Sequence, residues 1–313
     1  MDKYLLRIND AIERLQLPDE PQRLYEPISY TMAGGGKRLR PVLTLMTCDA
    51  LGGNLDEALP VALGIEMFHN FTLLHDDVMD RADVRRGRPT VHRRWNDNVA
   101  ILSGDAMLTL ATQLVARAPQ RCLPEVLALF NTTAMEIYEG QQWDMDFESR
   151  DDVTIDEYMN MIRLKTSVLL GCACKAGAIV TGADEAKAAQ FYSMAVDLGL
   201  AFQLQDDYLD VWGDPATFGK AIGGDIECGK KTFLLINALE RDDEVRSLIA
   251  GNSPDKVARV RAAYERMGLK ELVVEAIEDY TRRCQATLRD IGLSPEWHDK
   301  FNSLTLKLAH RQS

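Results

Sequence analysis

Apolar residues recur along almost the whole chain at the spacing of amphipathic helices. Near the amino-terminal end, Leu5, Ile8 and Ile12 return every three or four residues, which places them on one face of a helix. Stretches in which apolar and polar residues alternate, as they do in half-buried strands, are nearly absent. The hydrophobic pattern therefore predicts an all-α fold.

Proline and glycine divide this pattern into separate helices. Pro18 and Pro21 separate the first helix from a second one that ends near Met32, and residues 33–36 break the chain before Pro41. Proline is favoured in the first turn of a helix, so a third helix is expected to begin at Pro41. Helices are expected over residues 41–51, 55–80, 96–116, 123–148, 154–181, 183–211, 231–239, 254–267, 270–291 and 295–308.

Two polar segments interrupt the helices. Residues 81–94 form a basic loop that contains Gly87 and Pro89, and residues 213–229 form a second, glycine-containing loop. No low-complexity linker divides the chain. We therefore expect a single domain over residues 1–313, built as a bundle with long central helices.

The chain carries more acidic than basic residues. Its 48 Asp and Glu residues against 36 Lys and Arg residues give a formal net charge of −12. This charge argues against a protein that coats nucleic acid and against a polybasic membrane anchor. With 46% hydrophobic residues the chain can still bury a substantial core. No apolar run approaches the length of a membrane helix, so we expect no stable insertion into a membrane.

The first residues and the cysteines favour a cytoplasmic protein. Residues 1–10 carry two acids and no apolar run, so no signal peptide is expected. The six cysteines are scattered along the chain, which favours reduced thiols over disulfides. Cys172 and Cys174 are two residues apart, a spacing that fits neither a zinc nor a redox CxxC motif. We expect both to be small core residues of a helix.

Two motifs of the form DDxxD follow long apolar runs. The first contains Asp76, Asp77 and Asp80, and the second contains Asp206, Asp207 and Asp210. In each motif the first and last aspartates are four residues apart and share one helix face, where like charges repel. Carboxylates at the end of a helix also oppose its dipole. A solvated acidic helix end is the simple alternative. It is disfavoured, because the same repulsion between carboxylates occurs in both motifs.

Divalent cations would relieve the repulsion in both motifs. Carboxylate oxygens suit Mg²⁺, which takes one or two protein carboxylates together with water and phosphate oxygens. The two motifs therefore predict a site with more than one Mg²⁺ ion that binds a diphosphate.

Basic residues accompany both motifs. They are Lys37, Arg38 and Arg40 in a glycine-rich turn, Arg81, Arg85, Arg86 and Arg88 after the first motif, Lys165 in a separate helix, and Lys220, Lys230 and Lys231 after the second motif. Arginine and lysine bind phosphate oxygens, and one diphosphate needs fewer cations than these. The excess predicts two anionic substrates. Neutralisation of the aspartates by surface ion pairs is the alternative for Arg81 and Arg88.

Taken together, these motifs resemble those of the trans-isoprenyl (polyprenyl) diphosphate synthases, the family of the farnesyl and geranylgeranyl diphosphate synthases. The resemblance rests on GGGKRLRP at 34–41, LLHDDVMDRADVRRGRPTVH at 73–92, GQQWD at 140–144, KTS at 165–167, FQLQDDYLDVWGD at 202–214, GK at 219–220 and GKKT at 229–232. It covers nearly the whole chain. The resemblance implies an isoprenoid-synthase-type helical bundle with a deep central cavity, usually as a homodimer.

The same resemblance implies an activity and a set of site residues. The activity is the condensation of an allylic diphosphate (dimethylallyl, geranyl or farnesyl) with isopentenyl diphosphate. The resemblance assigns Mg²⁺ to Asp76, Asp77, Asp80, Asp206, Asp207 and Asp210, the allylic diphosphate to Arg85, Lys165 and Lys220 with Thr166, Gln203 and Lys230 nearby, and isopentenyl diphosphate to Lys37, Arg40, His69 and Arg86. For His69, core packing is the alternative interpretation.

These residue types fit an ionisation mechanism. Cations and Mg²⁺ stabilise the departing diphosphate, so no protein nucleophile is required. The carbocation must be kept from water, which predicts an apolar cavity. Hydroxyl and carbonyl dipoles near Thr166 and Gln203 are expected to stabilise the cation, and the proton is expected to leave to the released diphosphate.

The residues just before the first motif bear on product length. In the resembled family, bulk at these positions limits the growing chain, and here they are Phe71 and Thr72, with Phe68 one turn further back. One aromatic residue and no insertion in the motif resemble the archaeal type of geranylgeranyl synthase, so a C20 product is expected, with C15 as the alternative. The other interpretation is that both phenylalanines are ordinary core residues.

Three other functions are compatible with parts of the sequence. A terpene cyclase on the same fold usually lacks the second DDxxD motif and the GGGKRLRP turn. A non-catalytic regulatory subunit of a prenyl synthase typically loses aspartates from the motifs, and here all six are present. An acidic helical scaffold would depend on neither Mg²⁺ nor diphosphate. The synthase interpretation is the one that uses all the motifs.

Overall fold

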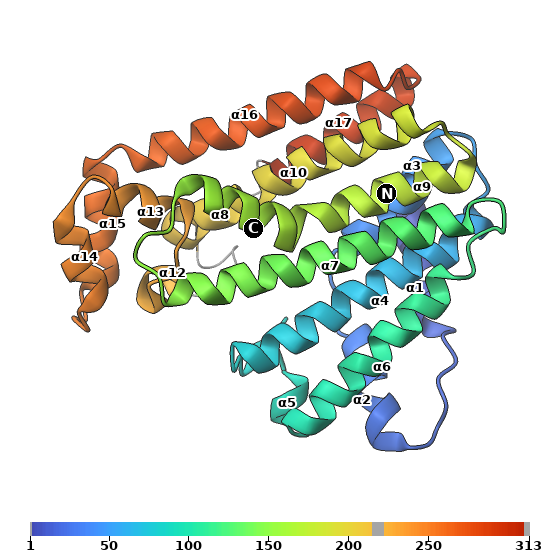
Figure 1. The fold of residues 1–313 in the computed structure, drawn as a ribbon, viewed down its shortest axis with the longest axis horizontal. Coiled ribbons are helices and arrows are strands. Elements are labelled where there is room, and N and C mark those ends of the chain that lie inside the picture. The colour runs from blue at the N-terminus through green and yellow to red at the C-terminus, as the bar shows by residue number, and fades with distance from the viewer. Residues whose placement is uncertain (1, 215–221, 310–313) are drawn as a thin grey trace. The chain divides into compact units, whose positions relative to one another are not determined.

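The computed structural model describes residues 2–214 and 222–309, and within these ranges the chain is helical apart from one small hairpin (Figure 1). The elements are α1 (Asp2–Glu13), α2 (Gln22–Met32), α3 (Leu39–Ala50), α4 (Leu55–Met79), β1 (Val84–Arg85), β2 (Arg88–Pro89), α5 (Val91–Arg94), α6 (Asp97–Val115), α7 (Leu123–Glu148), α8 (Ile155–Ile162), the π-helical turn η1 (Arg163–Ser167), α9 (Val168–Thr181), α10 (Glu185–Trp212), α12 (Gly224–Cys228), α13 (Phe233–Leu239), α14 (Asp243–Ala250), α15 (Lys256–Arg266), α16 (Leu269–Asp290) and α17 (Pro295–Ala309). The all-α prediction is confirmed.

The chain divides into two compact units. Unit 1 comprises Met1–Thr132 and Cys172–Ala189, and unit 2 comprises Thr133–Gly171 and Gln190–Ser313. The long helices α7, α9 and α10 each contribute residues to both units. The single domain expected from the sequence stays a prediction.

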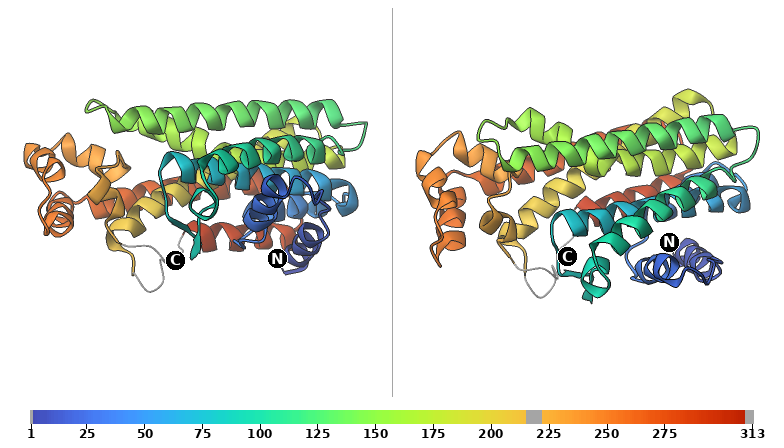
Figure 2. Two further views of the ribbon diagram at one scale, coloured as in Figure 1. Left: turned by 90° about the horizontal axis from the view of Figure 1, so that it is seen from below. Right: turned by 60° about the horizontal axis from the view of Figure 1, so that its bottom comes forward.

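Helix α4 is the centre of unit 1. It packs along α6 and also contacts α3, and Figure 2 shows α4 and α6 running side by side. The stretch from Val61 to Phe68 is buried without interruption, so this helix is covered on all sides rather than on one face. The side chain of Asn54 caps its first turn by accepting from the Asp56 amide at 2.9 Å. The first DDxxD motif lies at the opposite end.

The basic loop after α4 has more structure than the sequence indicates. Val84 pairs with Pro89 and Arg85 with Arg88 in an antiparallel hairpin, and the single-turn helix α5 follows it. The two connecting residues, Arg86 and Gly87, have φ of 52° and 73°. Tight hairpin turns favour positive φ at both central positions. The hairpin therefore presents Arg85 and Arg86 from a defined backbone rather than from an open loop.

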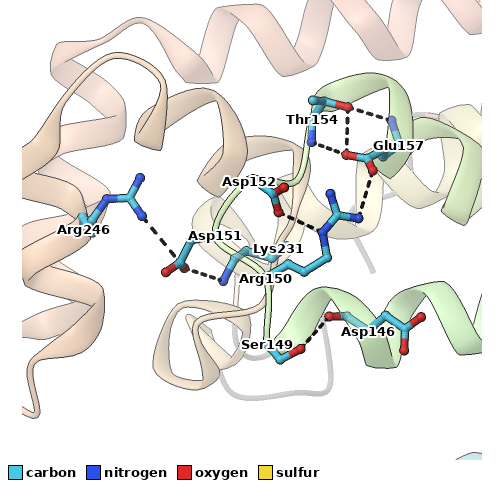
Figure 3. Close-up of polar contacts among 9 residues, drawn as sticks. All are labelled: Asp146, Ser149, Arg150, Asp151, Asp152, Thr154, Glu157, Lys231 and Arg246. Carbon is cyan, nitrogen blue, oxygen red and sulfur yellow. Dashed lines mark hydrogen bonds and ion pairs between the residues drawn. The ribbon is translucent and has the colours of Figure 1, made fainter.

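In unit 2 the helix predicted over residues 154–181 begins as expected but is interrupted. Thr154 caps α8 by a reciprocal capping box with Glu157, drawn in Figure 3. After two turns the chain widens into the π-helical turn η1, and only then continues as α9. Short π-helical turns within helices are frequent at functional sites. This turn contains Lys165 and Thr166.

The core of unit 2 is apolar and contains one end of α10. Tyr158, Leu204, Leu235 and Tyr264 belong to one cluster of buried side chains. Helix α13 contacts α8, α14, α15 and α16, and α16 lies against α17. The short helices α12 and α14 were not expected from the hydrophobic pattern. They lie in segments for which the sequence predicts a polar loop and a gap between two helices.

Two helical segments of the described chain are long and apolar enough to cross a membrane by length and composition alone, Asp97–Val115 and Ile155–Thr181. In the second segment, 78% of the most apolar window is buried inside the protein, as in a core helix. Both segments carry the packing contacts of a folded bundle, since α6 lies along α4 and α8 contacts α13. Cys172 and Cys174 are buried in α9, as predicted.

Candidate active site

The aspartates of the first motif point in different directions at the end of α4. Asp77 is buried, and the Arg85 guanidinium binds its carboxylate. Arg85 Nε donates to the two carboxylate oxygens at 2.8 and 2.9 Å. Burial raises the pKa of Asp77, and Arg85 only partly offsets this effect. Asp80 is exposed and Asp76 is half-buried. Asp77 therefore fastens the hairpin to α4, whereas Asp76 and Asp80 lie one turn apart on another face.

A group of partly buried or exposed basic side chains lies beside this motif in unit 1. The Arg40 guanidinium contacts His69 Nε2 at 3.1 Å, and Arg86 donates to the carbonyl oxygen of Gly35. Burial lowers the pKa of Arg40 to about 10 and, together with the nearby arginines, holds the pKa of His69 well below its usual range. His69 is therefore neutral at pH 7.

Not every cation of the glycine-rich turn has the same role. Arg38 is buried and donates to Glu66 at 2.7 Å and to the Met32 carbonyl oxygen at the end of α2. Asn70 donates to the same Glu66 carboxylate at 3.0 Å. These contacts make Arg38 a structural anchor of the turn. Lys37, in contrast, is exposed.

A pocket of unit 1 joins these elements. Its lining includes Gly34, Asn70, Asp77, Arg85 and Arg86. The structure thus brings the glycine-rich turn, α4 and the hairpin together around one hollow, and two of the predicted substrate ligands contribute to it. Arginine side chains at such a place suit a phosphate group.

The second motif, at the end of α10 in unit 2, resembles the first in that its second aspartate is buried and its first is half-buried. Asp207 is buried and accepts hydrogen bonds from the Tyr158 hydroxyl and from the Phe233 amide at 3.2 Å. Burial raises the pKa of Asp207 to about 7, although both hydrogen bonds oppose this shift. Asp206 is half-buried on the neighbouring face.

Asp210, the last residue of the second motif, is also buried. Its carboxylate accepts from the Asp225 amide at 3.2 Å, and its carbonyl oxygen accepts from the Gly223 amide at 2.6 Å. Asp210 therefore holds the start of α12 against the end of α10. The Lys220 position lies outside the described residues.

The π-helical turn brings Lys165 and Thr166 close to two other predicted residues, Gln203 and Lys230. The Thr166 hydroxyl donates to Gln203 Oε1 at 3.2 Å, which joins the turn to α10. The Lys165 ammonium group donates to Asp144 of α7 at 2.6 Å, and Lys230 approaches the same carboxylate oxygen at 3.6 Å. Burial opposes ionisation of Asp144, but the two ammonium groups outweigh it and hold its pKa below the usual value.

Lys231, the neighbour of Lys230, is directed elsewhere. It approaches Asp151 at 3.8 Å, and Arg246 lies 3.9 Å from the same carboxylate (Figure 3). Of the two adjacent lysines, Lys230 is therefore the one that joins Lys165. The sequence alone could not separate them.

The phenylalanines expected to limit product length belong to a cluster of tilted and edge-to-face aromatic rings on α4 and α7. Phe71 lies 5.5 Å from Phe68, and Phe68 lies 5.3 Å from Phe130 of α7, between ring centroids. His75 contacts the other side of Phe71 at 4.8 Å. The Thr72 hydroxyl donates to the His69 carbonyl oxygen at 2.8 Å. Both interpretations of the phenylalanines agree with this packing.

The carboxylates of the two motifs fit a hard divalent cation. Mg²⁺ takes one or two protein carboxylates and completes its shell with water and substrate oxygens. Oxygen donors without sulfur or imidazole also favour Mg²⁺ over zinc.

Comparison with known proteins places these features in a family. The model of the polyprenyl synthetase family matches residues 21–267. A short chain isoprenyl diphosphate synthase from Methanothermobacter thermautotrophicus is 40% identical over 90% of this chain and 87% of its own. A geranylgeranyl diphosphate synthase from Methanosarcina mazei is 41% identical over 75% of this chain and 73% of its own. A crystal structure of a geranylgeranyl pyrophosphate synthase superposes with a TM-score of 0.93 at 42% identity, over 100% of this chain and 98% of that one.

Proposed function

The chain belongs to the polyprenyl synthetase family, and on that premise we propose that it makes geranylgeranyl (C20) diphosphate. It is a short-chain trans-prenyltransferase, a polyprenyl diphosphate synthase that condenses an allylic diphosphate with isopentenyl diphosphate. The terpene cyclase and the regulatory subunit are not favoured, because the relatives that match most of the chain are named as synthases.

One observation carries the proposed site assignments: each unit holds a group of cations beside its own aspartate motif. In unit 1, Arg85 binds Asp77 and the partly buried pair of Arg40 and His69 lies nearby. In unit 2, Lys230 stands close enough to Asp207 to lower its pKa. Two cationic groups provide for two diphosphates, which is what the condensation requires.

The family uses Mg²⁺, and we assign its binding to the carboxylates of the two DDxxD motifs. Bound there, Mg²⁺ stabilises the negative charge that develops on the departing diphosphate. Asp76, Asp80 and Asp206 are our primary candidates, because they are exposed or half-buried. Asp77, Asp207 and Asp210 support them by fixing the hairpin, α13 and α12.

The allylic substrate is assigned to the cations of unit 2 together with Arg85. Lys165 and Lys230 hold positive charge where the leaving diphosphate gains negative charge, which favours ionisation of the carbon–oxygen bond. Thr166 and Gln203 are hydrogen-bonded to each other, so their oxygen dipoles are fixed before the carbocation forms. Lys220 belongs to this group by its motif.

Isopentenyl diphosphate is assigned to Lys37, Arg40, His69 and Arg86. His69 is neutral, so it offers a hydrogen bond rather than a charge to the diphosphate. The double bond of isopentenyl diphosphate attacks the allylic cation, and the proton then lost goes to the released diphosphate. Apolar side chains around the growing chain exclude water from the cation. We further propose that the enzyme is a cytoplasmic homodimer.

Product sizing tests the proposal. Purified enzyme is incubated with labelled isopentenyl diphosphate, Mg²⁺ and each allylic starter in turn, and the extracted products are separated by chain length. The expected result is a C20 product that disappears when EDTA removes Mg²⁺. An extract without any prenyl product would refute the synthase assignment, and a product that stops at C15 would refute the proposed length.

A further inference from the structure

The motif GQQWD at residues 140–144 has so far no task in the reaction. Its last residue, Asp144, lies in α7 with only 15% of its side chain exposed. One of its carboxylate oxygens receives both Lys165 at 2.6 Å and Lys230 at 3.6 Å. These lysines come from the π-helical turn and from the segment before α13, so a single carboxylate collects cations from two distant parts of the chain.

Two ammonium groups share one oxygen of the Asp144 carboxylate in a partly buried place. Electrostatic attraction is stronger there than in water, so the carboxylate fixes where both positive charges stand. The side chain of Lys165 is 23% exposed and that of Lys230 is 46% exposed, so a ligand can still reach both ammonium groups.

Gly140, one helical turn before Asp144, makes a second contact with the same turn. A Cβ atom at Gly140 would lie 2.4 Å from the backbone nitrogen of Lys165 and 2.8 Å from Leu164 Cβ. Such distances are impossible for real atoms, and a backbone nitrogen cannot yield as a flexible side chain can. Only glycine allows α7 to lie so close to the π-helical turn.

Residues 140 and 144 are four apart, so they lie on one face of α7. The glycine meets the backbone of Lys165, and the aspartate meets the end of its side chain. Gly199 of α10 approaches the same turn from another helix, because its Cβ atom would lie 2.7 Å from Ser167 Cα. The π-helical turn is therefore held by two helices with no room for an added methyl group.

We propose that Gly140 and Asp144 are positioning residues for the prenyl transfer: the glycine seats the π-helical turn on α7, and the carboxylate holds the ammonium groups of Lys165 and Lys230 together as a paired cation for the allylic diphosphate. This inference rests on the proposed function. It assigns Asp144 no contact with the reacting atoms. Its effect passes through the two lysines.

The first test is Asp144→Asn, with Asp146→Asn as the matched control. Asp146 is an exposed residue of the same helix whose carboxylate accepts from Gln142 at 2.8 Å. We expect Asp144→Asn to lower kcat about tenfold or more and to raise KM for the allylic diphosphate, with KM for isopentenyl diphosphate within about twofold of wild type, whereas Asp146→Asn changes none of these. A loss of thermal stability with unchanged kinetic constants would overturn the proposal.

A binding measurement separates positioning from simple charge. If Asp144 were only a negative charge near the substrate, its neutralisation would strengthen the binding of inorganic pyrophosphate and leave kcat unchanged. If it positions the lysines, Asp144→Asn binds pyrophosphate more weakly in isothermal titration. Tighter binding with full activity would therefore refute the proposal.

A mutant cycle tests whether the effect passes through the lysines. In a background that carries both Lys165→Gln and Lys230→Gln the two partners of Asp144 are missing, so we expect Asp144→Asn to lower kcat by less than about twofold further. An undiminished loss in that background would mean that Asp144 acts by another route, and the proposal would fail.

The glycine is tested by Gly140→Ala with Gly177→Ala as its control. A Cβ atom at Gly177 would lie 2.4 Å from the Thr44 carbonyl oxygen, an equally severe contact with another backbone, but in unit 1. We expect both variants to unfold at lower temperature and only Gly140→Ala to lose kcat beyond its loss of folded protein. Equal losses in both would assign Gly140 to general packing. Wild-type enzyme without product refutes the proposed function itself, whereas active wild type with unaffected variants refutes only this inference.

Discussion

Substitution of Phe71 by alanine distinguishes a chain-length determinant from a plain core residue. Phe71 lies between Phe68 at 5.5 Å and His75 at 4.8 Å, and only 5% of it is exposed. In a closed core, truncation to alanine leaves a cavity and costs about 3–5 kcal/mol of unfolding free energy. Beside the growing prenyl chain, the same truncation makes room that the product can occupy.

The size of the expected change follows from the side chain that is removed. The phenyl ring has about as many carbon atoms as one isoprenoid unit, so Phe71→Ala should lengthen the product by one unit, from C20 to C25. Phe68 then lies next along α4, buried against Phe130 at 5.3 Å, and stops a second addition. The double variant Phe68→Ala with Phe71→Ala should reach C30 in part.

The assay uses labelled isopentenyl diphosphate with farnesyl diphosphate, followed by dephosphorylation and chromatography against length standards. Phe301→Ala is the control, because Phe301 is buried in α17 and packs on Phe191 at 5.8 Å as another aromatic pair. It should lose stability and keep the C20 product. A Phe71→Ala enzyme that is destabilised by about 3–5 kcal/mol and still makes only C20 refutes the reasoning and assigns Phe71 to the core.

Three further predictions concern the two units. Gly36→Ala would place a Cβ atom 2.8 Å from Arg86 Cζ, so KM for isopentenyl diphosphate should rise about tenfold in steady-state assays. Glu66→Gln leaves the buried Arg38 without its negatively charged partner and should cost about 3–5 kcal/mol in urea unfolding. The raised pKa of Asp207, about 7 in the folded protein, means that its contribution to stability is fully present below about pH 4 and is lost as the pH rises through 7. Metal-free Asp207→Asn should therefore show a smaller fall of unfolding free energy between these pH values.

Each of these substitutions has a control in the same protein. Gly35 also has a positive φ, 74°, but a Cβ atom there meets nothing within 4 Å, so Gly35→Ala should leave KM for isopentenyl diphosphate unchanged. Arg261→Gln removes an exposed ion pair with Glu265, 3.2 Å long, and should cost less than about 1 kcal/mol. A pH dependence of Asp207→Asn identical to wild type would show that Asp207 titrates normally.

The hydrophobic pattern was sufficient for the long helices because burial on a helical period is a property of the sequence itself. It predicted a helix from residue 154, and in the structure Thr154 caps the first turn of α8. It missed the π-helical turn within that helix, where Gly140 of α7 lies close to the Lys165 backbone, because contacts between segments distant in the sequence are not encoded in the hydrophobic period. It also missed the hairpin at Arg86 and Gly87, whose turn type depends on positive φ at both positions.

At the site too, the sequence does not show which distant segments a side chain contacts. Arg38 and Arg40 stand two residues apart in one basic motif, yet only the packing on Glu66 makes Arg38 a structural anchor. Lys230 and Lys231 are adjacent, and their different partners decide which one joins Lys165. Residue type and spacing singled out these residues as candidates. Contacts between segments distant in the sequence decide what each residue does there.

The first and second aspartates of each DDxxD motif differ in burial and in their contacts. In both motifs the second aspartate is buried and engaged, Asp77 by Arg85 and Asp207 by Tyr158 and the Phe233 amide. A carboxylate committed in this way cannot move to an ion without leaving a buried donor unsatisfied, which costs about 1–3 kcal/mol. The first aspartates of the motifs, Asp76 and Asp206, are half-buried, so their carboxylates remain accessible to an ion. We therefore expect asparagine at the first position to raise the Mg²⁺ concentration needed for half-maximal activity, and asparagine at the second position to loosen the attached segment before it changes that concentration.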